Sequence, residues 1–174
     1  MASNKRKIKN IVFDVDGVFT TGQFLYTKDG KLAKVFGPHD NDGIKMIRPH
    51  LAICAITADK RGFDITKKRI DDMKIDLHLV SEGDRLSWMK EHFDLNETVY
   101  VGDGIFDAHI FGHVRYGIAP ANAFHLAKKH ADFVTKSKSG EGAVAEACIH
   151  ILEKFFERNE MLKELSGKKK KKQK

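Results

Sequence analysis

Two aspartates near the N-terminus, Asp14 and Asp16, are the residues best placed for chemistry. They follow an apolar run over residues 11–13, which predicts a buried parallel strand. Ligands of open α/β sheets bind at the carboxyl ends of strands, and carboxylates are costly there unless they bind metal or react. Gly17 permits a tight turn in which backbone N–H groups can approach an anion. The pair indicates a catalytic or Mg²⁺ site, although aspartates also stabilise turns through hydrogen bonds to the backbone.

Three later segments carry further polar groups at the ends or beginnings of expected elements. An apolar strand expected over residues 51–56 leads into Thr57, whose hydroxyl can donate to a phosphate oxygen. Arg85 begins an amphipathic stretch, and another apolar strand leads into Asp103 and Asp107. The order along the chain is therefore acid pair, hydroxyl, cation and acid pair.

This ordered set resembles the haloacid dehalogenase superfamily of phosphohydrolases over roughly residues 8–157. The resemblance implies that Asp14 is the nucleophile and forms an aspartyl phosphate. It implies that Asp16 protonates the leaving oxygen and then activates the hydrolytic water. Thr57 would hold the transferring phosphoryl group, and Arg85 would supply the cation of the third motif.

The resemblance also implies a Mg²⁺ cofactor and a cation beside the nucleophile. The family usually has lysine where this chain has Arg85, and a planar guanidinium fork differs from the point charge of an ammonium group. Lys60 or Lys90 could serve in its place. The implied metal ligands are Asp14, Asp16 through its backbone carbonyl, Asp103, and Asp107 as a further ligand or a partner of the ligands.

The short connections between these motifs leave no room for an inserted cap domain. This pattern resembles the capless branch typified by 3-deoxy-manno-octulosonate 8-phosphate phosphatase and its nonulosonate 9-phosphate relatives, which includes the C-terminal module of some animal CMP-sialate synthetases. In that branch hairpins assemble a tetramer in which a neighbouring subunit covers the site, so the resemblance implies a homotetramer. The matching segments are residues 13–18, 22–36, 40–44, 56–57, 101–103 and 140–143.

Departures from the octulosonate pattern concern the substrate. Asp59 stands where those enzymes have the arginine of Thr-Gly-Arg, Glu141 where they have that of Gly-Gly-Arg-Gly, and His39 where they have Arg before Asp40. Each change removes a cation that could pair with a substrate carboxylate, which favours a sialic-acid-type nonulosonate 9-phosphate over octulosonate 8-phosphate as the phosphosugar. The expected substrate-binding residues are Gly17, Asp40, Asp59 and Lys60.

Strand and helix patterns alternate along the chain, which predicts an α/β, Rossmann-like three-layer sandwich with a mainly parallel sheet and no cap domain. Asp29-Gly30 is a strong turn signal between partly alternating arms and predicts a protruding β-hairpin over residues 22–36. The expected strands cover residues 9–15, 51–56, 77–80, 98–101, 115–119 and 131–134, and the expected helices cover 42–48, 61–73, 84–93, 105–111, 121–130 and 141–158.

The length of 174 residues suits one domain, which we expect over residues 1–166, followed by a disordered polylysine tail over 167–174. The net charge is +7, but the last seven residues carry six lysines and the remainder carries only +1. This distribution favours a solvated tail over a nucleic-acid-binding surface, so no nucleic-acid partner is expected. Two cysteines and no apolar span indicate a cytoplasmic protein without a membrane partner.

Two other functions are compatible with parts of the sequence. The chain could be a non-catalytic tetramerisation module, as the synthetase-linked relatives suggest, but all four aspartates of the motifs are present. A phosphoacceptor receiver domain also presents aspartates at strand ends, but it has no use for Asp16 as a general acid and no place for the hairpin.

Overall fold

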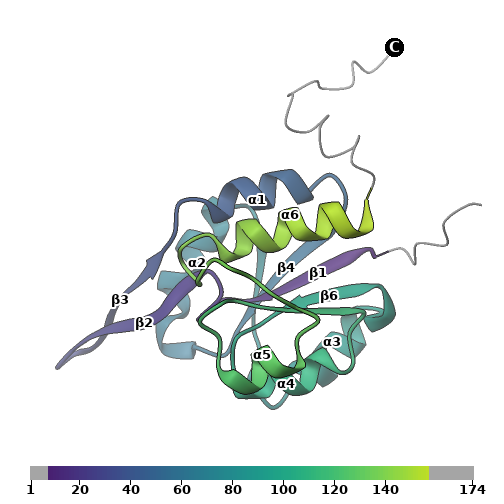
Figure 1. Cartoon of the computed structure of the whole chain (residues 1–174). Coiled ribbons are helices and arrows are strands. Elements are labelled where there is room, and N and C mark those ends of the chain that lie inside the picture. The colour runs from purple at the N-terminus through teal and green to yellow at the C-terminus, as the bar shows by residue number, and fades with distance from the viewer. Residues whose placement is uncertain (1–7, 157–174) are drawn as a thin grey trace, which may run out of the picture.

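The structure is a computed structural model that describes residues 8–156. The polylysine tail over 167–174 and the last part of the expected domain therefore lie outside the described residues. Figure 1 shows a central sheet with helices packed above and below it, and a long hairpin that leaves the body at one end.

The central sheet contains six strands in the order β5-β4-β1-β6-β7-β8, and every neighbouring pair is parallel. This arrangement confirms the expected α/β class and parallel sheet. The strands are β1 (Asn10–Asp14), β4 (Ala52–Thr57), β5 (Asp76–Leu79), β6 (Thr98–Val101), β7 (Tyr116–Ala119) and β8 (Phe133–Val134).

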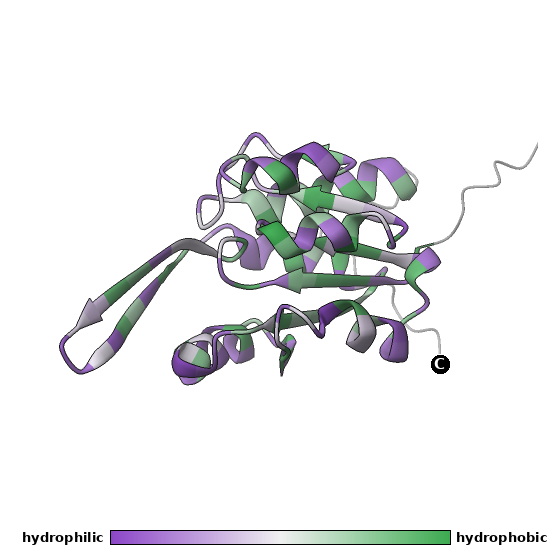
Figure 2. Ribbon diagram, turned by 90° about the horizontal axis from the view of Figure 1, so that it is seen from below, coloured by the Kyte–Doolittle hydropathy of each residue, from purple (hydrophilic) through white to green (hydrophobic). Residues whose placement is uncertain are grey.

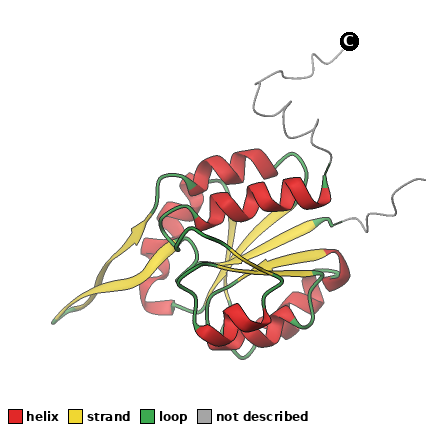
Figure 3. Ribbon diagram, viewed as in Figure 1, coloured by secondary structure: helices red, strands yellow, loops and turns green. Residues whose placement is uncertain are grey.

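Alternating side chains of the strands build the two faces of the sheet. Ile11 and Phe13 of β1 belong to one buried cluster, whereas Val12 belongs to the cluster on the opposite face. The first face is covered by α1 (Asp40–Ile47), α2 (Phe63–Asp72) and α6 (Ala143–Phe155), and the second by α3 (Arg85–His92), α4 (Ile105–Phe111) and α5 (His125–His130). Figure 3 shows the resulting three layers, with strands between helices.

The hairpin consists of β2 (Thr20–Thr27) and β3 (Gly30–Phe36), paired antiparallel in a separate two-stranded sheet. The predicted turn at Asp29-Gly30 is confirmed, with Thr27 opposite Gly30. Figure 2 shows the hairpin projecting from the body with hydrophobic and hydrophilic residues along its length. Only the hairpin and α1 lie between β1 and β4, so the expected absence of a cap domain in that connection is confirmed.

Some element boundaries differ from the expected ones. Residues 121–124 form a turn, with the backbone N–H of Ala123 bonded to the carbonyl of Pro120, so α5 begins only at His125. The last helix begins at Ala143 because Gly142 before it has a φ of 109°, a left-handed conformation that cannot continue a helix. Within residues 8–156, no helix combines the length and the apolar character needed to cross a membrane.

Candidate active site

Three adjacent strands bring the sequence motifs to one edge of the sheet. β1 lies between β4 and β6, so Asp14, Thr57 and Asp103 follow or end strands whose carboxyl ends are neighbours. Asp14 is in register with Ile56, one residue before Thr57. A cavity of about 430 Å³ opens at this edge, and the acidic and basic residues that line it include Asp14, Asp16, Asp59, Glu82, Arg85 and Asp107.

Arg85, the first residue of α3, places its guanidinium fork on the predicted nucleophile. Its Nη1 and Nη2 each lie 2.9 Å from one carboxylate oxygen of Asp14, and Nη1 also lies 2.9 Å from Oδ1 of Asp107. The Tyr100 hydroxyl donates to the same oxygen of Asp107 at 2.7 Å. Lys60 and Lys90 are exposed, so Arg85 is the cation that the fold places beside Asp14.

The acidic groups around Arg85 form a buried cluster with more carboxylates than cations. Asp14, Asp103 and Asp107 each offer a carboxylate oxygen within 4.8 Å of the others. Burial raises the pKa of Asp14 well above its ordinary value, and Asp107 and Asp103 add to this rise while Arg85 opposes it. Burial, with Asp107 beside it, also raises the pKa of Asp103 to about 7. An all-oxygen donor set with uncompensated negative charge fits Mg²⁺.

Close backbone packing fixes two of these carboxylates. Oδ2 of Asp107 accepts hydrogen bonds from the backbone N–H groups of Asp103 at 2.9 Å and Gly104 at 2.7 Å, which holds the turn after β6. Gly17 has a φ of 83°, and a Cβ atom there would lie 2.0 Å from a carboxylate oxygen of Asp103. Only glycine lets the loop after β1 approach Asp103 this closely.

The Asp16 carboxylate makes its side-chain contacts with β4 and the hairpin. Thr57 Oγ1 donates to its Oδ2 at 3.2 Å. Nζ of Lys34, in β3, lies 2.8 Å from Oδ1 and 2.9 Å from Oδ2 of Asp16. No signal in the sequence indicated Lys34, because its side chain lies in an arm whose pattern predicts exposure.

Comparison with known proteins places this geometry in a family. The sequence pattern of haloacid dehalogenase-like hydrolases matches residues 85–148. The 3-deoxy-D-manno-octulosonate 8-phosphate phosphatase of Haemophilus influenzae is 31% identical over 161 residues, which are 88% of this chain and 87% of that protein. The chain belongs to the haloacid dehalogenase-like hydrolases. Its similarity to phosphatases over nearly their whole length makes it a phosphatase of this family.

Solved structures of such phosphatases share the fold. The cobalt-bound form of the Haemophilus influenzae enzyme matches with a TM-score of 0.74 at 30% identity, over 86% of this chain and 90% of that one. The enzyme of Moraxella catarrhalis, solved with magnesium ion, phosphate ion and 3-deoxy-manno-octulosonate, matches with a TM-score of 0.79 at 23% identity, over 94% of each chain. At that identity the second likeness supports the fold alone.

The residues expected to bind substrate lie in different surroundings. The backbone N–H of Gly17 donates to the hydroxyl of Thr20 at 3.1 Å, which stabilises the loop after β1. Asp59 lines the cavity of about 430 Å³ described above, the candidate catalytic cavity, and pairs with Lys31 and Lys34 of the hairpin. Asp40 and Lys60 do not belong to the lining of this cavity, so their contact with substrate stays a prediction.

Asp40 is a buried residue at the contact between α1 and α6. Its Oδ1 accepts a hydrogen bond from the backbone N–H of Ala145 at 3.4 Å, and only 1% of the residue is exposed. Burial raises the pKa of Asp40 from 3.8 to about 6, although the backbone N–H groups of Ala145 and Val144 oppose this rise. The Asp40 carboxyl group therefore joins the two helices, and ionising it in the folded state lowers the free energy of unfolding.

We expect Asp40→Asn to remove one pH-dependent component of stability. Between a pKa of 3.8 in the unfolded chain and about 6 in the folded one, only the folded state keeps the proton, so the stabilisation falls as pH rises through this window. The variant cannot ionise, and above about pH 7 its free energy of unfolding should exceed that of the parent by on the order of 3 kcal/mol. Urea unfolding at about pH 4 and about pH 8 measures the difference, which should fall to below about 1 kcal/mol at the lower pH.

Asp42→Asn is the matched control, because Asp42 lies on the same helix with an exposed side chain that pairs with Lys45. Its stability should follow that of the parent at both pH values. If Asp40→Asn also follows the parent, burial of the Asp40 charge does not limit stability.

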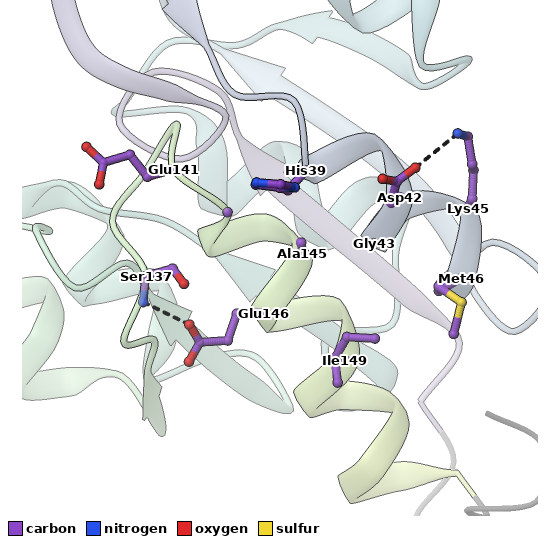
Figure 4. Close-up of a pocket in the computed structure, with 11 residues that line it drawn as sticks. His39, Asp42, Gly43, Lys45, Met46, Ser137, Glu141, Ala145, Glu146 and Ile149 are labelled. Carbon is purple, nitrogen blue, oxygen red and sulfur yellow. Dashed lines mark hydrogen bonds and ion pairs between the residues drawn. The ribbon is translucent and has the colours of Figure 1, made fainter. Parts of the chain in front are cut away.

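A second and larger cavity, of about 720 Å³, lies between α1 and α6 and shares no lining residue with the catalytic cavity. Figure 4 shows His39 and Glu141 at one end and Met46 and Ile149 at the other, with Glu146 bonded to the backbone of Ser137. His39 and Glu141 are two of the three departures from the octulosonate pattern. Within the described chain, only the third departure, Asp59, lines the catalytic cavity.

Proposed function

We propose that this phosphatase is a Mg²⁺-dependent phosphomonoesterase that works through an aspartyl phosphate on Asp14. The contact between the Arg85 fork and both oxygens of Asp14, beside the acid cluster, carries this proposal. Phosphatases of this family use Mg²⁺, for which Asp14, Asp103 and Asp107 would supply carboxylate ligands. Bound Mg²⁺ would supply positive charge that offsets the cluster and the phosphoryl oxygens.

The side chains divide the reaction into two steps. In the first, a carboxylate oxygen of Asp14 attacks phosphorus, the bond to the sugar oxygen breaks, and Asp16 gives that oxygen its proton. In the second, Asp16 takes a proton from water, whose oxygen attacks the aspartyl phosphate and releases inorganic phosphate. Arg85 and Thr57 stabilise negative charge on the phosphoryl oxygens during both transfers.

The proposed substrate is a small phosphosugar, a sialic-acid-type nonulosonate 9-phosphate. The support is that Asp59 stands where octulosonate phosphatases have an arginine that could pair with a substrate carboxylate. Its acidic group lines the catalytic cavity and is already paired with two lysines. The name of the Haemophilus influenzae relative favours a second candidate, 3-deoxy-manno-octulosonate 8-phosphate. Both are phosphate monoesters of sugar acids. The same six side chains could therefore hydrolyse either ester: Asp14, Asp16, Thr57, Arg85, Asp103 and Asp107.

Phosphate release from a panel of phosphosugars, with Mg²⁺ and with a chelator, tests this proposal. The panel contains a nonulosonate 9-phosphate and octulosonate 8-phosphate at matched concentrations. Metal-dependent turnover with a higher kcat/KM for the nonulosonate ester supports the proposed substrate, and the reverse order supports the second candidate. If no ester is hydrolysed and Mg²⁺ does not bind, the chain is a non-catalytic assembly module.

We also propose that the chain forms a homotetramer through its hairpin, with a neighbouring subunit covering the catalytic cavity. Five large hydrophobic residues of the hairpin are 42–59% exposed: Phe24, Leu25, Tyr26, Leu32 and Val35. An isolated two-stranded hairpin is marginal in water, and clustered apolar side chains indicate a contact surface. The neighbouring cover would exclude water from a site that has no cap domain of its own.

We expect the double substitution Leu25→Glu and Leu32→Glu to produce monomers or dimers, because charged groups in an apolar contact must be desolvated. Light scattering coupled to size-exclusion chromatography measures the mass. Leu79→Glu is the control, since Leu79 is a comparably exposed leucine that belongs to the central sheet and not to the hairpin. A parent chain that is monomeric at micromolar concentration contradicts the proposed assembly.

A cytoplasmic location is a further part of the proposal. Cys54 and Cys148 are both buried and unpaired, and they lie in β4 and α6. Burial raises the pKa of the Cys148 thiol above its ordinary value, which keeps it unreactive. Two such thiols are compatible with a reducing compartment. Fractionation of cells that express the chain tests this location.

A further inference from the structure

Lys34 is a fully buried cation that the hairpin delivers to the body of the protein. Its side chain is 0% exposed, although lysine is almost never buried without a partner. Figure 1 shows the base of the hairpin beside α2, and Lys34 of β3 bonds to Thr66 of this helix. A lysine in this position requires acceptors for all three of its protons.

The structure supplies those acceptors from three elements. Nζ of Lys34 donates to Oδ2 of Asp16 at 2.9 Å and to the hydroxyl of Thr66 on α2 at 2.7 Å, and it lies 2.7 Å from Oδ2 of Asp59. Gly62 leaves room for this arrangement, because a Cβ atom there would lie 2.8 Å from Cε of Lys34. The ammonium group is therefore enclosed by specific acceptors and is not part of a solvent-exposed ion pair.

Lys34 does not line the catalytic cavity, whereas Asp16 does. Its ammonium group contacts Asp16 and Asp59, which both line this cavity, and of these two carboxylates Asp16 is the proposed acid and base. Asp16 has two contacts that define its direction, the hydroxyl of Thr57 at 3.2 Å and the ammonium group of Lys34. Removing Lys34 would leave the hydroxyl as the single contact in the described chain that orients this carboxylate.

We propose that Lys34 is a positioning residue that holds the Asp16 carboxylate in place for proton transfer, so that the hairpin is part of the catalytic apparatus. The inference rests on the proposed role of Asp16 as acid and base. It adds a function to the hairpin beyond assembly, because β3 carries two of the exposed apolar residues, Leu32 and Val35, and also carries Lys34. Lys31, three residues before Lys34 on the same strand, pairs with Asp59 and also holds β3 to the body.

The experiment compares two classes of ester in Lys34→Met. An alkyl phosphate needs Asp16 in both steps, whereas p-nitrophenyl phosphate has a leaving group that departs without a proton. Turnover of the alkyl ester should fall by about 10- to 100-fold with little change in KM, because Lys34 does not touch substrate. The first-phase release of nitrophenolate should stay within about twofold of the parent while its steady-state turnover falls, because only the second step then needs Asp16.

Lys45→Met is the control, since Lys45 is an exposed lysine on α1 paired with Asp42, and it should leave both esters unaffected. Thr66→Val provides a second test if Lys34→Met does not fold: it removes one anchor of Lys34 without touching Asp16 and should give the same pattern with a smaller loss. Unchanged alkyl turnover in a folded variant overturns the inference, and so does an equal loss in the first phase of nitrophenolate release. Phosphatase activity that survives in Asp14→Asn would instead refute the proposed function, which keeps the two failures apart.

Discussion

Replacing Asp14 by Asn should lower kcat/KM by about 10⁴-fold or more, because the amide cannot form the aspartyl phosphate. Asparagine has nearly the same shape and can still accept a hydrogen bond from Arg85, so the fold should be retained. The variant also removes one charge from a buried cluster that holds more carboxylates than cations. Its thermal unfolding should therefore occur at the same or a higher temperature than that of the parent.

The measurement is phosphate release with the best ester of the panel, alongside the midpoint of thermal unfolding. Asp42→Asn is the matched control, because it makes the same chemical change on an exposed residue. A folded Asp14→Asn protein whose turnover stays within about tenfold of the parent would exclude Asp14 as the nucleophile. Mass spectrometry of the purified variant excludes deamidation of Asn to Asp as a source of activity.

Replacing Arg85 by Met should both inactivate and destabilise the protein. Arg85 is 5% exposed and contacts Asp14 and Asp107, so its removal leaves buried carboxylates without a counter-charge. Loss of one partner of a buried ion pair costs about 3–5 kcal/mol, and loss of a cation at a transferring phosphoryl group costs roughly 10³-fold or more in rate. Urea unfolding in a chelator and steady-state turnover with Mg²⁺ measure the two effects.

The same variant tests whether the cluster holds a divalent cation. If Mg²⁺ and Arg85 neutralise the same carboxylates, Mg²⁺ should raise the free energy of unfolding of Arg85→Met more than that of the parent. Arg85→Lys should lie between them, because one ammonium group cannot contact both oxygens of Asp14 as the fork does. Equal stabilisation of all three proteins by Mg²⁺ would contradict a shared set of carboxylates.

The order of motifs was sufficient to predict which strand ends meet. Asp14, Thr57 and Asp103 could be placed together because parallel strands joined by helices present their carboxyl ends at one edge. The turn signal at Asp29-Gly30 predicted the hairpin, and local patterns predicted the six α-helices of residues 8–156, with errors mainly at their ends, such as the turn before His125. These features depend on local pattern and on general rules of connection, both of which a single sequence contains.

The contacts between the hairpin and the body of the protein could not be predicted in this way. Lys34 lies in an alternating arm with Lys31, a pattern that also suits two solvated lysines. Its burial depends on how the base of the hairpin packs against α2 and on the space left by Gly62. Neither feature produces a periodic pattern in the sequence. The contact of Tyr100 with the site was also not predicted, although the sequence held a signal for it. A tyrosine in a buried strand needs a partner for its hydroxyl, and here that partner is Asp107.

The covalent intermediate is the central claim of this account, and trapping it is the most direct test. Asp16→Asn cannot activate water, so p-nitrophenyl phosphate should phosphorylate this variant faster than the phosphoryl group is released. Acid quenching followed by peptide mass spectrometry should then find one phosphoryl group on Asp14, and none in Asp14→Asn. A phosphoryl group on another residue, or phosphate release by the parent with no covalent phosphoryl group in the trapped variant, would contradict the account.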